Sequence, residues 1–437
     1  MRRIGFFYPV LILVAVNILN FYDRQVPGAL AEPLRKEFHL TDSQLGLLGS
    51  AFIWLYAAVG LPLGRLADRW SRKKLLACGV GVWALLTASA AIASGFGMLI
   101  VSRLGVAVGE AVAAPTATSW IGDLFAPHRR ARALSLFMLG VPIGGALSFF
   151  LSGPIAQNYG WRAAMVTAAL PAIVLIPALL TLYEPQRGAA EIDPHLQSTT
   201  SSWSVLRIPT LWWIIASGAL FNFNMYAIGS FLPAFFSRIH GSSLAASGIQ
   251  TGIVYLVGGV TGGVLAGIWG DRIVHRRKDG RMLSAAIIAF LSAPFSYIGI
   301  VLPPGSPSLI ILVMGSLAVA YAALNAYYGL VYSSIQDIVP PAMRGTAMAL
   351  YFMLMYFCGA SMGPLVTGAL SDAMAHRAAQ AAGSPVLTEA FKAVGLQQAM
   401  LVIPVLSVGL ALVLWVGSRT ILRDLVHKPE AVPAPAV

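Results

Sequence analysis

Long apolar runs separated by short polar loops follow one another along almost the whole chain. Each run is at least about 20 residues long, enough for an α-helix to cross a hydrocarbon core of about 30 Å. The pattern therefore predicts an all-α membrane protein with twelve transmembrane helices. They are expected near residues 7–33, 43–67, 75–94, 96–124, 131–157, 161–183, 208–237, 244–270, 282–302, 308–336, 345–371 and 394–418.

A polar stretch from Glu184 to Arg207 divides these runs into two sets of six. We therefore expect two pseudo-symmetric bundles of six helices each. The expected boundaries are 1–183 for the N-terminal bundle, 184–207 for a cytoplasmic linker, 208–420 for the C-terminal bundle and 421–437 for a cytoplasmic tail. The tail is rich in Pro and Ala and is predicted to be disordered.

Short motifs recur in the two halves in the same order. The loop GRLADRWSRKK (64–74) has a counterpart in GIWGDRIVHRRK (267–278), and Arg130 precedes span five as Arg344 precedes span eleven. In a parallel repeat of this kind, the two bundles enclose a site near the middle of the membrane and rock about it. The repeat therefore predicts a site between the halves.

Composition supports the membrane assignment and explains the charge. The chain is 57% hydrophobic and 11% charged, whereas soluble proteins carry about 25% charged residues. Most of its 29 lysines and arginines fall in alternate loops, on the side of both termini. This is the positive-inside pattern, so the net charge of +12 requires no nucleic-acid partner. The first run lacks a small-residue cleavage site and is interpreted as a retained helix rather than a signal peptide.

The sequence lacks the signature motifs of several kinds of function. No Gly-Lys-Ser or Gly-Lys-Thr phosphate loop occurs, so ATP is not expected to drive the protein. The seven histidines fall in loops or at the edges of spans, so we expect neither a metal nor another cofactor. Cys78 and Cys358 lie within predicted spans and imply no disulfide scaffold.

Four ionisable side chains fall inside predicted spans, and all four are in the N-terminal half: Asp23, Arg24, Arg103 and Glu110. Each costs about 2.5 to 3.5 kcal/mol in the bilayer core unless it is paired or faces water. Asp23 and Arg24 point about 100° apart on one helix, so their partners must lie on another helix. From the helical rise, we expect Asp23 level with Arg103 and Arg24 directed toward Glu110.

These charges have two open interpretations. In the first, they form an internal ion-pair network that only holds spans one and four together. In the second, Glu110 or Asp23 exchanges a proton with a cavity, Arg103 is an ion-pair partner, and Arg24 binds an anionic head group. Competition between the substrate and Glu110 for Arg24 would then couple the two fluxes.

Polar residues on other spans are candidates for the remaining walls of the cavity. Asn20 recurs with Arg24 at helical spacing, and such a polar stripe should face the bundle interior. Asn222, Asn325 and Tyr328 are expected on the C-terminal wall, because an amide needs hydrogen-bond partners that hydrocarbon cannot supply. Packing is the alternative role for any one of the aromatic residues. A pocket charged on one wall and amide-plus-aromatic on the other suits an amphiphile with an anionic head.

Charged residues in equivalent loops of the two halves are expected to gate the cytoplasmic side. An acidic member can cap a helix N-terminus, where the helix dipole favours an anion, and pair with a neighbouring arginine. The alternative is that these loops only anchor the topology. The candidates are Asp68, Arg69, Arg72 and Arg130 in the first half, and Asp271, Arg272 and Arg344 in the second.

Two of these motifs resemble the signatures of a known family. GRLADRWSRKK resembles the loop signature of the major facilitator superfamily, and RLGVAVGEA (103–111) resembles its fourth-helix signature. The first-helix NFYDRQ, together with Glu110, resembles the spinster branch, whose animal members export sphingolipids and lysophospholipids. The resemblance covers nearly the whole chain and implies the major facilitator fold, with functional roles for the Asp-Arg pair and the glutamate.

We therefore expect a monomeric, proton-coupled transporter of the bacterial inner membrane that works by alternating access. The resemblance implies an amphiphilic anionic substrate, such as a lysophospholipid or a sphingolipid. The alternatives are a proton symporter for a small organic anion such as a sugar acid, a drug/proton antiporter, and a multi-pass membrane enzyme acting on lipid. Lipid carriage predicts a cavity open sideways between spans five and eight or two and eleven, whereas a sugar-acid carrier predicts a closed polar pocket.

Overall fold

The structure is a computed structural model that describes residues 4–67, 69–125, 127–186, 202–274, 276–339 and 343–425. Within these ranges all regular secondary structure is helical and no β-strand occurs. Eleven ranges are long and apolar enough to cross a membrane. They correspond to the second to twelfth expected spans, and the first expected span is occupied by α1 (Ile4–Ala29). With 26 residues, α1 is about 39 Å long, which also suffices to cross a bilayer.

Ten α-helices make up the first half of the chain. They are α1 (Ile4–Ala29), α2 (Ala31–Phe38), α3 (Asp42–Ala67), α4 (Arg72–Ser89), α5 (Phe96–Glu110), α6 (Ala113–Leu124), α7 (Pro127–Met138), α8 (Gly140–Tyr159), α9 (Trp161–Ala169) and α10 (Ala172–Thr181), with a 3-10 turn η1 (Ala90–Ile92) after α4.

The second half begins with a 3-10 turn. Its elements are η2 (Ser202–Arg207), α11 (Pro209–Arg238), α12 (Leu244–Val274), α13 (Gly280–Val301), α14 (Pro307–Ile338), α15 (Arg344–Met355), the π-helix η4 (Tyr356–Ala360), α16 (Met362–Ala381), α17 (Glu389–Met400) and α18 (Val402–Asp424).

Several expected spans consist of two consecutive helices. The sixth breaks between α9 and α10 at Pro171, whose ring nitrogen cannot donate the hydrogen bond that a continuous helix requires. The eleventh contains the π-helix η4, an irregularity that is frequent at functional sites. α16 also continues to Ala381, about ten residues past the expected end, because its polar extension is rich in alanine, the strongest helix former.

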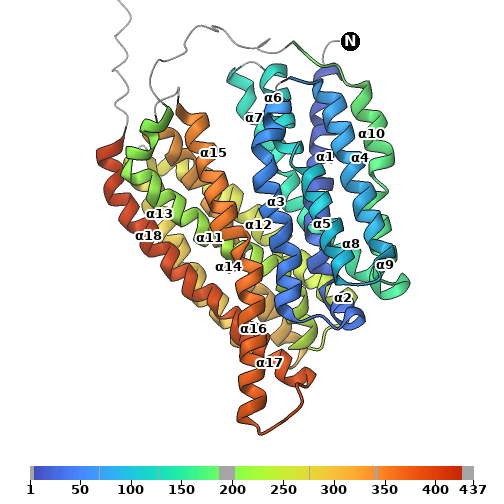
Figure 1. Cartoon of the computed structure of the whole chain (residues 1–437). Coiled ribbons are helices and arrows are strands. Elements are labelled where there is room, and N and C mark those ends of the chain that lie inside the picture. Colours follow the sequence, from blue (N-terminus) through green and yellow to red (C-terminus); the bar gives the residue numbers. More distant parts are fainter. Residues whose placement is uncertain are drawn as a thin grey trace, which may run out of the picture.

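The helices form two groups, one from each half of the chain (Figure 1). The groups contact each other mainly through α1 with α11, α3 with α16, and α8 with α12, and further contacts join α11 to α2 and α3, and α3 to η4. They lie close together at the end that carries α2 and α17, here called the α2 end (Figure 1). They diverge toward the opposite end, here called the linker end, where α1 begins and α10 ends.

Glycines permit this close contact at the α2 end. A Cβ atom on Gly28 of α1 would collide with the carbonyl oxygen of Gly229 on α11. Nearer the linker end, a Cβ on Gly64 of α3 or on Gly267 of α12 would meet nothing within 4 Å. The two halves are therefore packed backbone against backbone at one end and separated at the other.

Candidate functional site

The charged residues of α1 and α5 meet inside the N-terminal group of helices. The Nε atom of Arg24 donates to Oε2 of Glu110 over 2.8 Å. The Arg24 side chain is 5% exposed and the Glu110 side chain is fully buried. The pairing expected from helical geometry is therefore present. Removal of either partner would leave an uncompensated buried charge, which is strongly destabilising.

Asp23 points to a different set of neighbours, as adjacent residues on a helix must. Its Oδ2 atom accepts a 2.6 Å hydrogen bond from the Thr87 hydroxyl on α4. Its Oδ1 atom lies 4.0 Å from Nη1 of Arg103, within ion-pair range but without a hydrogen bond. The sequence placed Asp23 level with Arg103, but nothing in the pattern of span three marked Thr87 as its hydrogen-bond donor.

Aromatic rings surround the two guanidinium groups. The Cζ atom of Arg24 lies 4.4 Å from the ring centre of Tyr56 and 4.7 Å from that of Phe21. The Cζ atom of Arg103 lies 5.0 Å from the ring centre of Phe52 on α3. A cation over an aromatic face gains about 0.5 to 2 kcal/mol, more when desolvated. Sequence reasoning missed Phe52 and Tyr56, because an aromatic residue in an apolar span resembles ordinary packing.

A cavity lies between the two groups of helices beside these charges. It contains about 570 Å³ of empty space, part of it open to solvent. Both arginines, Arg24 and Arg103, line it, and Tyr226 and Ser230 of α11 face them from the C-terminal group. The remaining lining residues are Gln25, Pro27, Gly28, Ala31, Leu45, Leu48, Gly49, Phe52, Ile53 and Gly229. The cavity therefore combines two cationic groups with a largely apolar wall.

The other expected substrate contacts lie outside the lining of this cavity. Asn20 is 3% exposed on α1. Asn222 is fully buried and donates to the carbonyl of Gly218 and to the sulfur of Met355, at 2.9 and 3.2 Å. Asn325 donates to the carbonyl of Tyr321, one turn away on its own helix. A role for these amides in substrate binding stays a prediction.

Tyr328 belongs to an aromatic cluster in the C-terminal group. Its ring centre lies 4.8 Å from that of Phe221 and 5.0 Å from that of Tyr332, both in edge-to-face geometry. Across the gap between the groups, the ring of Tyr356 in η4 lies 5.8 Å from that of Tyr56 in α3. Aromatic side chains from both halves, Tyr56 and Tyr356, thus meet next to Arg24.

Only some of the residues expected to gate the cytoplasmic side lie in the described part of the chain. Asp68 and the side chains of Arg130, Asp271 and Arg344 lie outside the described part of the chain. Arg69 and Arg272 are exposed. Their roles in gating stay predictions.

Arg72 is fully buried at the linker end and makes contacts within the N-terminal group. Its Nη2 atom donates to Oδ2 of Asp123 over 2.6 Å. Oε1 of Glu184 accepts a 2.6 Å hydrogen bond from the backbone N–H of Arg72, and Oε2 accepts one of 2.6 Å from the Ser71 hydroxyl. Glu184 therefore caps the N-terminus of α4.

Replacement of Glu184 by glutamine is expected to destabilise the fold by about 1 kcal/mol at neutral pH, the usual contribution of a helix cap. Burial raises the pKa of Glu184, but hydrogen bonds from Ser71 and from the amides of Arg72 and Lys73 outweigh it and hold that pKa below 4.5. The stabilisation should be complete above pH 4.5 and vanish as pH falls through the lowered pKa. Thermal unfolding of wild type and Glu184→Gln in detergent at pH 7 and pH 3 tests this. An equal loss of stability in the variant at both pH values would contradict the prediction.

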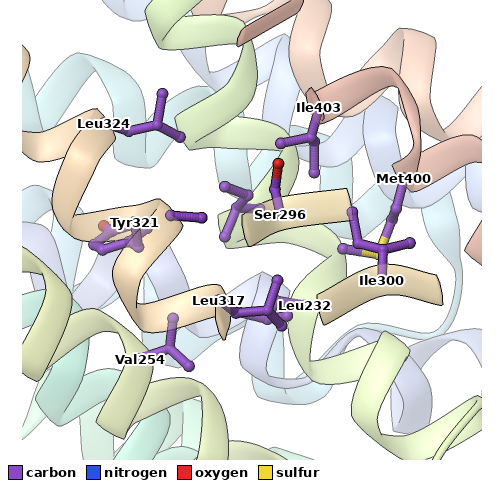
Figure 2. Close-up of a pocket in the computed structure, with 11 residues that line it drawn as sticks. Leu232, Val254, Ser296, Ile300, Leu317, Tyr321, Leu324, Met400 and Ile403 are labelled. Atoms are coloured by element: carbon purple, nitrogen blue, oxygen red, sulfur yellow. The ribbon is translucent and has the colours of Figure 1, made fainter. Parts of the chain in front are cut away.

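A second cavity lies inside the C-terminal group, among α11, α12, α13, α14, α17 and α18 (Figure 2). Its lining is aliphatic, apart from Tyr321, Ser296 and Met400. The Ser296 hydroxyl donates to the carbonyl of Ser292, 2.8 Å away on its own helix. No charged side chain lines this cavity, so it offers no counter-charge for an anion. Elsewhere in the described residues, no cluster of His, Cys, Asp and Glu could hold a metal ion.

Comparison with known proteins gives concordant results. The family model described as Major Facilitator Superfamily matches residues 13–364. An MFS-type efflux pump of Mycolicibacterium smegmatis is 30% identical over 421 residues, covering 95% of this chain and 94% of the pump. Human protein spinster homolog 1 is 28% identical over 388 residues, covering 83% of this chain and 72% of its own length.

Comparison with solved structures agrees with these sequence matches. The crystal structure of a bacterial homologue of the human lysosomal transporter Spinster, inward-facing and unoccupied, superimposes with a TM-score of 0.86 at 26% identity. It covers 98% of this chain and 100% of that one. A D-xylose–proton symporter superimposes with a TM-score of 0.69 at 19% identity, over 94% of this chain and 97% of the symporter. At that identity the likeness shows the fold alone.

Proposed function

Because the chain belongs to the Major Facilitator Superfamily and resembles its spinster branch, we propose that it is a proton-coupled secondary transporter. In this proposal it moves an amphiphilic anionic substrate, such as a lysophospholipid or a sphingolipid, by alternating access. Family and fold indicate a transporter rather than an enzyme. Proton coupling and the lipid substrate are the proposed part.

The buried pair of Arg24 and Glu110 at the edge of the cavity supports this function most directly. Arg24 lines the cavity, while Glu110 lies behind it and is fully buried. An anionic head group in the cavity competes with Glu110 for the same guanidinium, because Arg24 has a limited number of donors. When the head group takes Arg24, the buried Glu110 is left without its cation and takes up a proton instead. Binding of the substrate and uptake of a proton are thereby coupled.

An amphiphile suits the cavity better than a fully polar solute. Apart from the two arginines, most of the lining is apolar or aromatic, which provides surface for hydrocarbon and few hydrogen-bond partners. The named spinster relatives are consistent with a lipid-like substrate, and the mycobacterial efflux pump is consistent with outward transport. A drug/proton antiporter remains the alternative, since this relative is named an efflux pump.

Sideways entry of a lipid is possible only through part of the seams between the halves. The α8–α12 seam is tight where a Cβ on Gly252 would lie 2.9 Å from the ring of Phe150, and the α3–α16 seam is tight at Gly46 and Pro364. Toward the linker end the two groups of helices diverge (Figure 1), and a Cβ on Gly64 or Gly267 would meet nothing within 4 Å. We infer that a lipid enters from that end, which we assign to the cytoplasmic side of a bacterial inner membrane, with both termini there and the protein a monomer.

Flux into proteoliposomes with an imposed pH gradient tests the proposed function. We expect labelled lysophospholipid to redistribute at least about tenfold faster with the gradient than without it, and a sugar acid not to respond. The gradient dependence should disappear with a protonophore. A response to the sugar acid alone would favour the small-anion symporter, and chemical conversion of the lipid would favour an enzyme. Glu37→Gln, which removes a surface carboxylate paired with Arg162 at 2.6 Å, serves as the control variant.

A further inference from the structure

The outward face of α18 carries a row of exposed apolar side chains. Val405, Val408, Leu412 and Trp415, here called the α18 stripe, recur at intervals of three or four residues and are 36% to 67% exposed. This spacing places them on one face of the helix. α18 runs along the edge of the C-terminal group that faces away from the N-terminal group (Figure 1). In a membrane protein, the α18 stripe therefore contacts the acyl chains of lipids.

Two arginines continue this face toward the linker end, where α18 ends (Figure 1). Arg419 lies one turn beyond Trp415, Arg423 lies one turn beyond Arg419, and both are exposed. With 23 residues, α18 is about 35 Å long, which exceeds the hydrocarbon core of about 30 Å. Arg419 precedes the last helical residue, Asp424, by about 8 Å along the axis. Both guanidinium groups therefore lie at the depth of the lipid head groups.

An indole ring contacts the first of these arginines. The Cζ atom of Arg419 lies 3.9 Å from the ring centre of Trp415. Such a contact orders the long arginine side chain but leaves its N–H donors available, because they radiate from the edge of the planar group. Trp212, at the start of the neighbouring helix α11, is 45% exposed. Tryptophan is enriched where hydrocarbon meets head groups, so both rings support the depth assigned to Arg419.

The acidic residue at this helix end, Asp424, has another role. Its Oδ2 atom accepts a 2.9 Å hydrogen bond from the backbone N–H of Thr210 and so caps the start of α11. A 2.7 Å hydrogen bond between the hydroxyls of Thr210 and Thr420 joins the two helix ends. Within the described part of the chain, no ion pair neutralises Arg419 or Arg423. The helix end therefore presents two positive charges without an internal counter-charge.

We propose that Arg419 and Arg423, with the indole ring of Trp415, bind the phosphate group of an anionic phospholipid such as phosphatidylglycerol. The three residues are here called the α18 lipid site. The guanidinium groups donate to the phosphate oxygens, a charge-assisted arrangement for which arginine is well suited. The acyl chains lie along the α18 stripe, which is continuous with the arginines. A zwitterionic lipid gains less, because its ammonium group brings a positive charge close to the two arginines.

The α18 lipid site is separate from the proposed transport cavity. The cavity is lined by Arg24, Arg103 and residues of α1, α2, α3 and α11, and its lining includes no residue of α18. The phospholipid is therefore a bound component of the bilayer and not the transported substrate. Because it binds the folded protein, it should stabilise the fold by mass action.

Native mass spectrometry of the detergent-purified protein measures the affinity for single lipid molecules. Wild type should bind its first phosphatidylglycerol about thirtyfold more tightly than phosphatidylcholine, since each arginine near a head group contributes about fivefold. The double variant Arg419→Gln with Arg423→Gln should lose this preference. Trp415→Leu keeps an apolar side chain but removes the ring beside Arg419, and should weaken binding of phosphatidylglycerol about two- to fivefold. Phosphatidylglycerol should also raise the unfolding temperature of wild type but not that of the double variant.

Two control variants are matched to these changes. Arg276→Gln removes an exposed arginine at the same end of the molecule, from the loop between α12 and α13, and should bind phosphatidylglycerol as wild type does. Arg24→Gln changes the cavity and should also leave this binding unchanged. A failure of the proposed function is therefore distinguishable from a failure of the α18 lipid site.

Several results would overturn the proposal. One is equal affinity of wild type for the two lipids, and another is an unchanged preference in the folded double variant. Tighter binding of a soluble acidic peptide than of phosphatidylglycerol at these arginines would do the same. If the double variant does not fold, Arg419→Gln and Arg423→Gln are tested singly, and each should weaken binding of phosphatidylglycerol about fivefold.

Discussion

Gradient-driven transport is expected to fall to the level of passive leak, by about 100-fold, when Glu110 is replaced by glutamine. Glutamine keeps the size and one hydrogen-bond acceptor for Arg24, but it cannot exchange a proton. Exchange of substrate down its own gradient should persist, because the arginine and the cavity are intact. The measurement is proteoliposome flux with and without a pH gradient, combined with counterflow at equal pH on the two sides.

Two further variants separate coupling from structural pairing. Glu37→Gln removes a carboxylate from a surface ion pair and should transport as wild type does. The double variant Arg24→Gln with Glu110→Gln replaces the buried pair by two neutral amides that can still bond each other. If the pair only holds α1 and α5 together, this double variant should be stable and active. Normal pH-dependent transport by Glu110→Gln, or by the double variant, would contradict the coupling role.

Replacement of Arg24 by glutamine is expected to weaken binding of an anionic amphiphile by about 100-fold, the loss of a charge-assisted pair of hydrogen bonds. Arg24 is the cavity residue whose guanidinium already pairs with a carboxylate, at 2.8 Å. Arg24→Lys should retain part of the affinity, because lysine keeps the charge but not the planar fork. Binding of a lysophospholipid to the purified protein is followed by calorimetry or by tryptophan fluorescence.

The experiment must distinguish the loss of a ligand contact from a loss of stability of the helix bundle. Thermal unfolding of Arg24→Gln is measured in parallel, since the variant leaves Glu110 buried beside a neutral partner. Arg162→Gln, an arginine lost from the surface of the same half, should bind as wild type does. Equal affinity of wild type and a folded Arg24→Gln would assign Arg24 to structure alone, and a neutral amphiphile should bind both equally.

The pairing of the intramembrane charges was predictable because it follows from helix geometry. Once spans one and four were recognised, a rise of about 1.5 Å per residue fixed the depth of each charge, and the cost of an isolated charge in hydrocarbon required a partner. Arg24 accordingly meets Glu110 at 2.8 Å. Asp23 lies near Arg103 as expected, although its closer partner is Thr87, at 2.6 Å. A hydroxyl in an apolar span gives no comparable signal.

The ion pairs that Arg238 makes with Glu32 and Asp42 escaped sequence reasoning for a different reason. These three residues lie at helix ends, where charged residues are common and usually face water. Arg238 and Asp42 are 196 positions apart, and neither belongs to the repeated motifs. Their burial depends on how the two halves meet at the α2 end, which the periodicity of single helices does not specify.

The sequence by itself determined the number and type of spans, the internal repeat and the need for partners for four buried charges. These properties follow from local rules, namely the length of apolar runs, helical rise and the cost of charge in hydrocarbon. Only the tertiary structure decided which end of the molecule is closed, that aromatic rings of both halves meet beside Arg24, and that Glu32, Asp42 and Arg238 are buried together. Those features arise from contacts between distant segments, whose geometry is set by packing of the whole bundle.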